Sequence, residues 1–412
     1  MHMQEWRMTT IAECSTILGD GLHGTPKYDE NGEYAFINGN NLHNGKIVIK
    51  PDTKRVGLSE YEKHKKELTD RTVLVSINGT LGNVAVYNGE KVILGKSACY
   101  FNVSSDCDVQ FMRYVASSPC FQQYINSVAT GTTIKNVSLK QMREYSFLIP
   151  ELEEQQRIAK VLHLLDQKIE NNQKINDNLQ QQIKSLVTAW LVDYIPFGGE
   201  MPSDWCTISL ATIADFVSGY SYKGAELQPS TTAMATIKNF DRNGGFKLDG
   251  FKELVPSSKI KPCHYAEKFD VIVSHTDLTQ KAEVIGNAEP IINLSGYESI
   301  VFSMDLVKVV PKDTRVSKFL LAALLQHPRF KAHCLGYVNG TTVLHLSKKA
   351  LPDYELDFPT DPAVLVPLDD ALRVLYMQMA TIVDENRKLQ DLRDTLLPRL
   401  MSGQIDVTDI DF

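Results

Sequence analysis

A repeat of about 200 residues runs through the chain and constrains its fold more than any other feature. Over its later part, a single offset of 209 residues relates one copy to the other. Matches that keep their order and spacing over so many positions indicate two copies of one structural unit. The matches are Trp6 with Trp205, 11–13 with 213–215, 40–45 with 239–244, 73–76 with 271–274, Pro119 with Pro328, Phe121 with Phe330, 131–133 with 340–342, Ser138 with Ser347, and 170–175 with 384–389.

The first 150 or so residues of each copy mix short β-branched and aromatic runs with turn signals. Asn-Gly pairs such as Asn44-Gly45 and Asn78-Gly79 are typical of tight hairpin turns. Residues 110–125 and 318–330 have a helical pattern inside this β-rich background. We therefore expect an α+β fold class in which each copy forms an α/β globule with many irregular loops.

Each copy closes with a long helix. Apolar positions step by four and three residues over more than four heptads, which is typical of a coiled-coil seam. Pro150 and Pro367 stand where the helices begin, and Gly198 and Gly403 follow their ends. Two unrelated surface helices would leave their equal length and matching polar positions unexplained. The expected seam positions are Ile158, Leu162, Leu165, Ile169, Asn172, Asn176, Leu179, Ile183, Leu186 and Trp190, and Leu368, Leu372, Leu375, Met379, Ile382, Asn386, Leu389, Arg393, Leu396 and Leu400.

Two matched helices in one chain can bury both seams by pairing with each other. Antiparallel pairing would relate the two copies by a pseudo-twofold axis and separate the globules by about 50 Å of helix. The Asn residues in the seam should fix its register at some cost in stability. The pattern predicts five segments, namely 1–150, 151–194, 195–203, 204–360 and 361–412.

The net charge of −7 is unevenly distributed. Lys and Arg balance Asp and Glu in residues 1–150 (16 against 15) and 195–352 (17 against 15), whereas residues 353–412 hold 5 against 13. Phosphate contacts by the two globules alone would therefore give only modest DNA affinity, and partners would have to supply much of the grip. Seven cysteines without a Cys-x-x-Cys pair favour a reducing cytoplasm over a disulfide framework or zinc finger. No long apolar run predicts a membrane span.

No known catalytic motif is complete in the sequence. The run from Gly89 to Ser97 has five residues between its glycines where a phosphate loop needs four. The run from Pro51 to Lys54 offers one carboxylate, which cannot hold a metal and position water. Neither the Asn/Asp-Pro-Pro-aromatic run of an adenine methyltransferase nor its Gly-rich cofactor loop occurs, and no metal site is expected. We expect a chain without catalytic residues of its own.

Several motifs resemble the specificity subunits of type I restriction–modification systems. The run from Ile149 to Ala159 resembles the opening of the first conserved helix of that family, and the run from Leu396 to Ile405 resembles the end of the second. Trp6 and the run 202–205 resemble the openings of its two target-recognition domains, and the two Gly-Thr-Thr runs resemble their ends. The opening of the second helix, from Val366 to Leu372, departs from the family because it lacks the Glu-Gln pair.

The resemblance implies a non-catalytic, cytoplasmic subunit that reads a bipartite double-stranded DNA site with an unread spacer. It also implies two methyltransferase subunits that use S-adenosylmethionine, and restriction/translocase subunits that use ATP and Mg²⁺. The chain itself would need no cofactor. On this interpretation, residues 1–150 and 204–360 are the target-recognition domains and 195–203 is a linker.

Candidate site residues follow from the turns, from polar chemistry and from the family signatures. Asn and Thr can contact adenine edges and thymine methyl groups, and glycine permits close approach to the DNA backbone. Formation of turns is the alternative role of the same residues. The candidates for DNA binding are Ser76, Asn78, Thr80, Gly131, Thr132, Thr133, Lys135, Asn136, Lys238, Arg242, Ser274, His275, Thr276, Gly340, Thr341, Thr342 and His345. The candidates for partner binding are Glu154, Gln155, Arg157, Leu397, Pro398 and Arg399.

Two other functions stay open at the level of sequence. A coiled-coil scaffold that spaces two protein-binding modules would share the repeat and both helices. A fragment of a fused restriction enzyme is a third, weaker interpretation. Binding of DNA by the chain together with a methyltransferase partner would separate the first interpretation from the scaffold.

Overall fold

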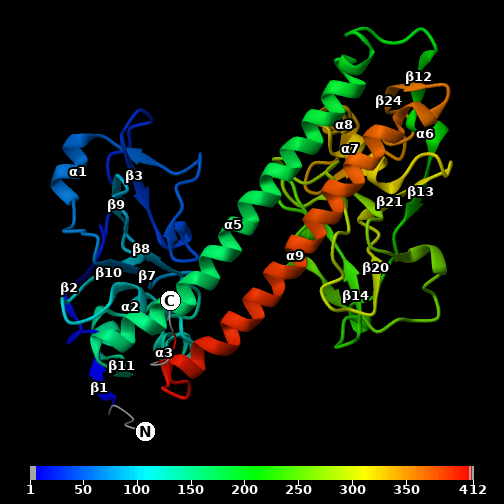
Figure 1. Ribbon diagram of the computed structural model, residues 1–412. Helices are drawn as coiled ribbons and strands as arrows, with labels where there is room; N and C mark the ends of the chain where they lie inside the picture. The colour runs from blue at the N-terminus through cyan, green and yellow to red at the C-terminus, as the bar shows by residue number, and fades with distance from the viewer. Residues whose placement is uncertain (1–5, 408–409, 411–412) are drawn as a thin grey trace. The chain divides into compact units, whose positions relative to one another are not determined.

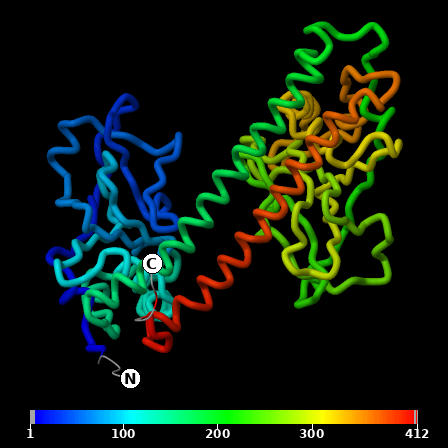
Figure 2. The backbone as a smooth tube through the Cα atoms, in the orientation of Figure 1, coloured from blue at the N-terminus to red at the C-terminus, as the bar shows by residue number. Residues whose placement is uncertain are grey.

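The computed structural model describes residues 6–407 and residue 410, which form two compact units. Unit 1 contains the chain up to Ile169 and again from Lys388 onward, and unit 2 is formed by Glu170–Arg387. The chain therefore leaves unit 1, builds unit 2 and returns to unit 1 (Figure 2). Two long helices, α5 (Leu152–Leu191) and α9 (Val366–Met401), each contribute one segment to both units.

Unit 1 is a mixture of short strands and helices (Figure 1). Its largest sheet has four strands in the order β2-β10-β7-β8. The three-stranded sheet β6-β3-β9 and the pairs β1-β11 and β4-β5 complete the unit. The elements are β1 (Arg7–Thr10), β2 (Ser15–Asp20), β3 (Tyr34–Ile37), β4 (Leu42–His43), β5 (Lys46–Ile47), β6 (Arg55–Val56), α1 (Leu58–His64), β7 (Thr72–Ser76), β8 (Val84–Val86), β9 (Val92–Leu94), β10 (Ala98–Val103), α2 (Val109–Ser117), α3 (Pro119–Val128), α4 (Leu139–Glu144) and β11 (Ser146–Ile149).

Unit 2 repeats this plan in three of its four sheets. Its orders β13-β21-β17-β19, β15-β14-β20-β16 and β12-β24 correspond to the sheets of unit 1, and β18-β23-β22 is extra. The elements are β12 (Trp205–Ser209), α6 (Leu210–Ile213), β13 (Ala214–Ser218), β14 (Thr232–Ala235), β15 (Lys252–Glu253), β16 (Tyr265–Ala266), β17 (Val271–Ser274), β18 (Thr276–Asp277), β19 (Ala288–Pro290), β20 (Ser299–Phe302), β21 (Leu306–Pro311), α7 (Lys318–Gln326), α8 (Pro328–Leu335), β22 (Val338–Asn339), β23 (Leu344–Leu346) and β24 (Glu355–Pro359).

The duplication extends to single hydrogen bonds. The N–H of Gly95 donates to Ile37 O in unit 1, and the N–H of Ser303 donates to Ala235 O in unit 2, at 2.8 and 2.9 Å. Gly21 and Gly219 occupy the same close approach, because a Cβ at either position would lie 2.2 or 2.0 Å from the carbonyl oxygen of Leu94 or Ser303. The internal repeat predicted from sequence is thus confirmed by topology and by backbone bonding.

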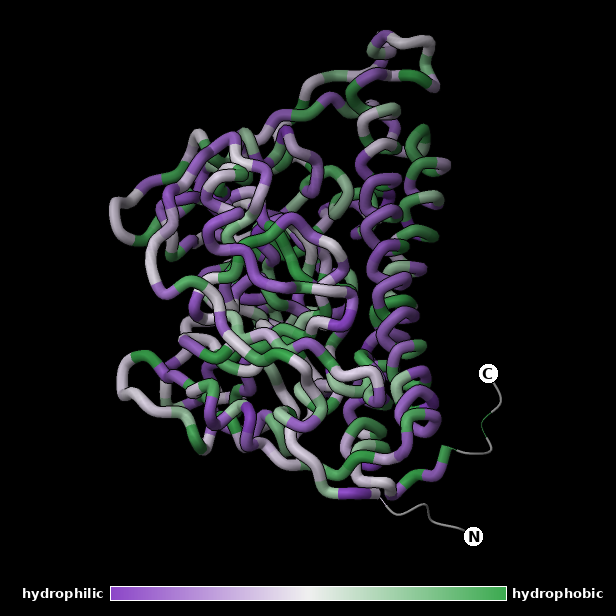
Figure 3. The backbone as a smooth tube through the Cα atoms, turned by 90° about the vertical axis from the view of Figure 1, so that its left-hand side faces the viewer, coloured by the Kyte–Doolittle hydropathy of each residue, from purple (hydrophilic) through white to green (hydrophobic). Residues whose placement is uncertain are grey.

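The seam of the long helices lies where the sequence places it. None of the twenty expected seam positions is exposed, and Figure 3 shows hydrophobic and hydrophilic residues alternating along both helices. The first part of α5 packs with the last part of α9 in unit 1, and the last part of α5 packs with the first part of α9 in unit 2, so the helices run antiparallel within the units. In unit 2, Asn172 Nδ2 donates to Asn386 Oδ1 at 2.8 Å, as expected for a register-fixing pair.

Two expectations need correction. The predicted helices at 110–125 and 318–330 are each two helices, because Ser118 and His327 are extended before Pro119 and Pro328 (ψ 148° and 139°). A proline disfavours helical backbone in the residue before it, and its ring cannot continue the preceding helix.

The structure also corrects two of the sequence matches. The N–H of Ile11 donates to Tyr145 O and that of Leu210 donates to Tyr354 O, so Ile11 corresponds to Leu210 and not to Ile213.

The match of 40–45 with 239–244 shifts by one residue. Asn41 Nδ2 donates to Val48 O, and Asn239 Nδ2 donates to Lys247 O, each closing the same short loop. Asn239 therefore corresponds to Asn41, and the sequence alignment that paired it with Asn40 is wrong. Both amides are buried, so their shared role is structural.

Candidate nucleic-acid interface

In unit 1 the structure brings the two predicted loop motifs together. The turn after β7 and the Gly-Thr-Thr loop after α3 lie side by side, because the N–H of Gly79 donates to Lys135 O at 2.9 Å. Asn78 Nδ2 also donates to Asn136 Oδ1 at 3.1 Å. The candidates Asn78, Thr80, Lys135 and Asn136 therefore share one surface, although about 55 residues separate the two motifs.

Unit 2 builds the equivalent surface with strands. β18 pairs with β23, so that Thr276 lies opposite His345. The N–H of Leu346 donates to His275 O at 2.9 Å, and Gln280 Nε2 donates to Thr342 O at 3.3 Å. The turn after the central strand and the Gly-Thr-Thr loop thus meet in each unit.

The Gly-Thr-Thr loops are open to solvent. Gly131, Thr132, Thr133, Lys135 and Asn136 are exposed, as are Gly340, Thr341, Thr342 and His345. Gly131 and Gly340 have φ of 95° and 110°, and a Cβ there would lie 2.3 and 2.2 Å from a backbone oxygen three residues later. Glycine is required for the turn itself, which holds the two threonines outward. Neither loop segment, 129–137 or 338–349, contains an acidic residue that would repel phosphate.

Some candidates are internal instead. Ser76 and Ser274 are fully buried. Ser76 Oγ accepts the N–H of Asn83 at 2.8 Å, and Ser274 Oγ donates to Thr276 O at 2.9 Å. Thr276 is also buried. Burial favours the turn-forming role for these three residues over direct contact with bases.

His275 is half-buried, so its burial is intermediate between that of the exposed candidates and that of the internal ones. Burial lowers the pKa of its imidazole, and the positive charges of His345 and Lys348 lower the pKa further. The ring is therefore held in its neutral form near pH 7, where one nitrogen donates and the other accepts.

Sequence reasoning missed the loop that follows Asp277 in unit 2. Six more residues separate Ser274 from Gly286 than separate Ser76 from Gly82, while the N–H of each glycine donates to the O of the serine. Asp277 accepts the N–H groups of Thr279, Val284 and Ile285. Lys331 Nζ donates to the carbonyls of Ala282 and Glu283 at 3.1 and 3.3 Å and also to Ile285 O.

These contacts make the inserted loop an ordered part of the surface. Burial raises the pKa of Asp277, but the hydrogen bonds outweigh it and leave the pKa below the ordinary value. The loop presents Leu278, which is 66% exposed, and exposed Gln280 and Lys281. An Asp directly after a buried β-branched strand was the available sequence signal, since Asp commonly closes such turns.

Lys238 and Arg242 lie on another part of unit 2. Lys238 is exposed on the short 3-10 helix Ile237–Asn239, and exposed Arg242 lies 3.4 Å from Glu283. The ion pair directs Arg242 to the base of the inserted loop. Arg242 therefore borders the loop surface, and Lys238 is not bonded to it by any contact that the structure records.

The partner candidates at the start of α5 divide into internal and external residues. Gln155 is buried, accepts the N–H of Asp108 at 2.8 Å and donates to Pro150 O at 2.9 Å. Glu154 accepts the indole N–H of Trp6 at 3.3 Å, and burial raises the pKa of its carboxyl above the ordinary value. Arg157 forms an ion pair with Glu153 at 2.7 Å. The Glu-Gln signature thus joins α5 to its own unit.

In unit 2 the missing Glu-Gln pair is replaced by another bond. Ser317, which caps α7 as Asp108 caps α2, donates its hydroxyl to Asp369 at the start of α9. At the end of α9, Leu397 is buried, Pro398 is half-buried and Arg399 is exposed. Arg399 is therefore the most accessible of the three partner candidates there.

Metal and membrane chemistry find no support in the described part of the chain. Within residues 6–407 no group of three or more His, Cys, Asp or Glu side chains is arranged to hold a metal ion. His333 contacts Ala350 O while Cys334 is buried, so this neighbouring pair does not share a ligand position. No helix among the same residues combines the length and apolar character needed to cross a bilayer.

The fold and the paired loop surfaces define a class of protein: a duplicated α+β protein whose two equivalent loop surfaces are carried by one antiparallel helix pair. Residues 3–181 match the family described as "Type I restriction modification DNA specificity domain". Residues 3–181 therefore carry this specificity domain, and the chain as a whole is similar to the specificity subunits of type I restriction–modification systems, which are non-catalytic.

Relatives and a solved structure agree with this assignment. The chain is 22% identical to the MjaIX specificity subunit of Methanocaldococcus jannaschii, with 99% of this chain and 95% of that protein covered. It is 21% identical to the HindI specificity subunit of Haemophilus influenzae over 69% and 74% of the two chains. The crystal structure of an S subunit from M. genitalium matches with a TM-score of 0.54 and 19% identity over 97% of each chain, and it supports the fold.

Proposed function

We propose that this chain reads a bipartite DNA site, with one loop surface on each half-site and an unread spacer between them. The observation that carries the proposal is the meeting of the central-strand turn and the Gly-Thr-Thr loop in each unit. Exposed Thr and Asn side chains suit base edges and phosphates, and Lys135 adds a positive charge. Residues 1–150 and 204–360 are the proposed target-recognition domains.

The proposal includes partners because the chain is acidic overall. Two methyltransferase subunits using S-adenosylmethionine would dock on the helices, with exposed Arg399 and half-buried Arg157 as contact candidates. Restriction/translocase subunits using ATP and Mg²⁺ would join that assembly. The partners would clamp the DNA, and the loop surfaces would select the sequence.

The decisive experiment changes one loop surface at a time in the complex with a methyltransferase subunit. Thr132→Ala with Thr133→Ala alters unit 1, and Thr341→Ala with Thr342→Ala alters unit 2. Lys63→Ala, on exposed α1, is a matched control outside both loops. Sequencing of methylated sites should show weaker discrimination at one half-site in the first variant and at the other half-site in the second.

The outcomes separate DNA reading from the scaffold interpretation. Each good base contact gives about 1–3 kcal/mol of discrimination, so loss of one contact should alter preference about fivefold or more at single positions. A scaffold that spaces two protein-binding modules predicts unchanged site preference in both variants. Equal loss at both half-sites, together with a lower melting temperature, would indicate misfolding of the variant and would require the single substitutions.

A further inference from the structure

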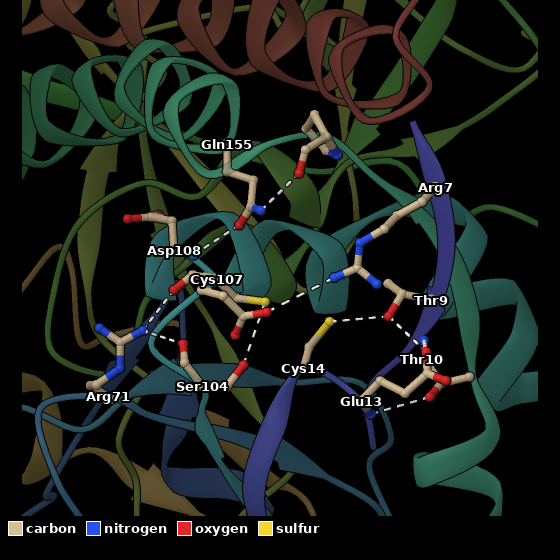
Figure 4. Close-up of polar contacts among 12 residues, drawn as sticks. Arg7, Thr9, Thr10, Glu13, Cys14, Arg71, Ser104, Cys107, Asp108 and Gln155 are labelled. Atoms are coloured by element: carbon tan, nitrogen blue, oxygen red, sulfur yellow. Dashed lines mark hydrogen bonds and ion pairs between the residues drawn. The ribbon is translucent and has the colours of Figure 1, made fainter. Parts of the chain in front are cut away.

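Two buried thiols face each other in unit 1. Cys14 lies between β1 and β2, and Cys107 lies just before α2 (Figure 4). The N–H of Ser104 donates to Cys14 O at 2.9 Å, and the N–H of Cys107 donates to Ser104 O at 3.1 Å. Both cysteines are 1% exposed, and Figure 4 shows their sulfur atoms in one small region, with that of Cys14 linked to Thr9. The backbone thus holds the two thiols together from opposite sides.

Hydroxyl groups surround the two sulfur atoms. Thr9 Oγ1 lies 3.5 Å from Cys14 Sγ, and Ser104 Oγ donates to Cys107 Sγ at 3.6 Å. A hydrogen bond from Cys107 lowers the pKa of the Cys14 thiol to about 7, although burial acts in the opposite direction. Burial raises the pKa of Cys99, and it raises that of Cys334 to about 12. The same hydrogen bond between Cys107 and Cys14, together with burial, raises the pKa of Cys107, so Cys14 is the thiol of the pair that ionises more readily.

In unit 2, the positions equivalent to Cys14 and Cys107 hold aliphatic residues. The N–H of Lys312 donates to Ile213 O at 2.9 Å, as that of Ser104 does to Cys14 O, and the N–H of Val316 donates to Asp313 O at 3.0 Å, as that of Cys107 does to Ser104 O. Unit 2 has one more residue at this junction, and Val316 precedes the cap Ser317 as Cys107 precedes the cap Asp108. Ile213 and Val316 are both buried in the core of unit 2. Aliphatic side chains are therefore sufficient to fill this part of the core. The two thiols of unit 1 are reactive groups that core packing does not require.

We propose that Cys14 and Cys107 form a dithiol site that peroxides oxidise to an intramolecular disulfide. The Cys14 thiolate attacks one peroxide oxygen, the O–O bond breaks, and the departing hydroxide takes up a proton to become water. The sulfur of Cys107 then attacks the sulfenic acid, forming the S–S bond and breaking the S–O bond. The second hydroxide leaves as water with the proton of Cys107, so two thiols are oxidised and one peroxide is reduced.

The site lies directly beneath the surface. Exposed Glu13 precedes Cys14 and exposed Asp106 precedes Cys107, so a small oxidant needs only a local opening of these turns. Exposed Cys120, Cys206 and Cys263 have no second thiol that the structure places beside them. Reversible disulfide formation within the chain is therefore expected at the buried pair, while the exposed thiols follow other oxidation routes.

The new bond would join two structural junctions of unit 1. Arg71 donates to Ser104 O and Cys107 O, both at 2.6 Å, and the next residue, Asp108, caps α2 and donates its N–H to Gln155 at the start of α5. A disulfide would tie the turn between β1 and β2 to this junction. Cross-linking restricts the unfolded chain, so oxidation should raise the melting temperature of unit 1 by several degrees and leave unit 2 unchanged.

The test uses the full chain with Cys120→Ser, Cys206→Ser and Cys263→Ser. The protein is treated with hydrogen peroxide, the remaining thiols are alkylated in denaturant, and the peptides are mapped without reduction. A peptide pair linked through Cys14 and Cys107 is expected, with Cys99 and Cys334 alkylated and the link reversed by dithiothreitol. Full alkylation of Cys14 and Cys107, or a sulfinic acid at Cys14 without any link, would overturn the proposal.

A matched variant copies the other unit. In Cys107→Val, which carries the residue of unit 2, Cys14 should form a sulfenic acid that dimedone traps and should give no intramolecular link. If this variant melts more than a few degrees lower than its parent, Cys107→Ser serves instead, because serine keeps the size and cannot resolve the sulfenic acid. Absence of dimedone labelling in both variants, with Cys14 recovered as a thiol, would show that Cys14 is not the attacking sulfur.

Discussion

Units 1 and 2 share a backbone plan but hold the long helices with different chemistry. In unit 1, the carboxylate of Asp166 on α5 forms ion pairs with Arg113 at 2.8 Å and with Arg393 of α9 at 3.1 Å. It also accepts the hydroxyl of Tyr114 at 2.7 Å. In unit 2, Gln326 of α7 joins buried Glu289 of β19 to Tyr376 of α9 through bonds of 2.7 and 2.6 Å. At these contacts unit 1 uses a group of ion pairs around Asp166, and unit 2 uses a chain of hydrogen bonds through Gln326. Unit 2 also holds α9 through Asp369 and through the ion pair of Lys268 with Asp384.

The comparison shows which parts of a duplicated fold are free to diverge. Equivalent backbone bonds and close-approach glycines have stayed the same in both copies, because any change there displaces a strand. The polar connection between globule and helix has been rebuilt with other residue types at other positions. The two units should therefore respond differently to loss of one partner and to pH.

The largest effect is expected from Arg113→Met. This change removes the principal cation beside Asp166, and breaking a buried ion pair from one side costs about 3–5 kcal/mol. Urea unfolding followed by Trp6 fluorescence, with Trp190→Phe and Trp205→Phe, should show the loss in unit 1. Lys312→Met is the matched change in unit 2, where the exposed pair with Asp215 should contribute less than about 1 kcal/mol. Equal losses would refute the difference between the units.

The next effect is a pH dependence of opposite sign in the two units. Burial raises the pKa of Glu289 from 4.5 to about 7, so its stabilising contribution is present below pH 4.5 and is lost as the pH rises through about 7. Burial also acts to raise the pKa of Asp166, but Arg113 lowers it below 3.8, so this contribution is lost as the pH falls.

Unit 2 should lose up to roughly 3 kcal/mol between pH 4.5 and 7, because one pKa unit corresponds to about 1.4 kcal/mol. Trp190 and Trp205 report on unit 2 in a Trp6→Phe background. Glu289→Gln should abolish this pH dependence and leave that of unit 1 unchanged. A retained slope in Glu289→Gln would assign the titration to another group.

A smaller effect is expected from Asn172→Leu in the seam of unit 2. The change removes hydrogen bonds of 2.8 Å to both Asn386 and Glu385 from a site that is 1% exposed. Loss of such buried bonds costs about 1–3 kcal/mol. Asn172→Leu together with Asn386→Leu should recover most of this stability as an apolar pair, and failure to recover it would contradict a role confined to register.

The smallest effect concerns the loop surfaces and rests on the proposed function. Lys135→Ala should weaken binding of the assembled complex to all DNA sequences alike and reduce the salt dependence by up to about one unit of slope. His345→Ala changes the equivalent loop of unit 2 without removing a lysine, and it should alter the slope less. An unchanged slope for Lys135→Ala would favour a purely structural loop.

Local periodicity was sufficient to predict the long helices, and ordered matches about 200 residues apart were sufficient to predict the repeat. The seam positions from Ile158 to Trp190 repeat every three or four residues, and that spacing alone determines which face is buried. Pro119 and Pro328 also carried the information that each shorter helix is broken, although the helical pattern was read across them.

The loop surfaces depended on contacts that no local pattern encodes. Asn78 and Asn136 meet because strands and helices far apart in sequence place their turns together. The burial of Ser76 could not be predicted from the sequence either, because the residue types at the end of a strand are the same whether their side chains face water or the core. The loop after Asp277 is held by hydrogen bonds from Lys331 on α8, 54 residues away from Asp277, and no local pattern encodes that position.

The loops that follow β7 and β17 are closed by equivalent backbone hydrogen bonds, and this bears on how such a protein evolves. The N–H of Ser76 donates to Asn83 O and that of Ser274 donates to Asn287 O, so both loops begin and end on the same pair of backbone anchors. Between the anchors, one unit carries six residues and the other twelve. Because the entropy cost of closing a loop grows slowly with its length, segments of very different size fit the same frame. Exchange of that segment between related genes would alter the exposed surface and leave the four-stranded sheet intact. Recombination could therefore replace this loop without unfolding the unit.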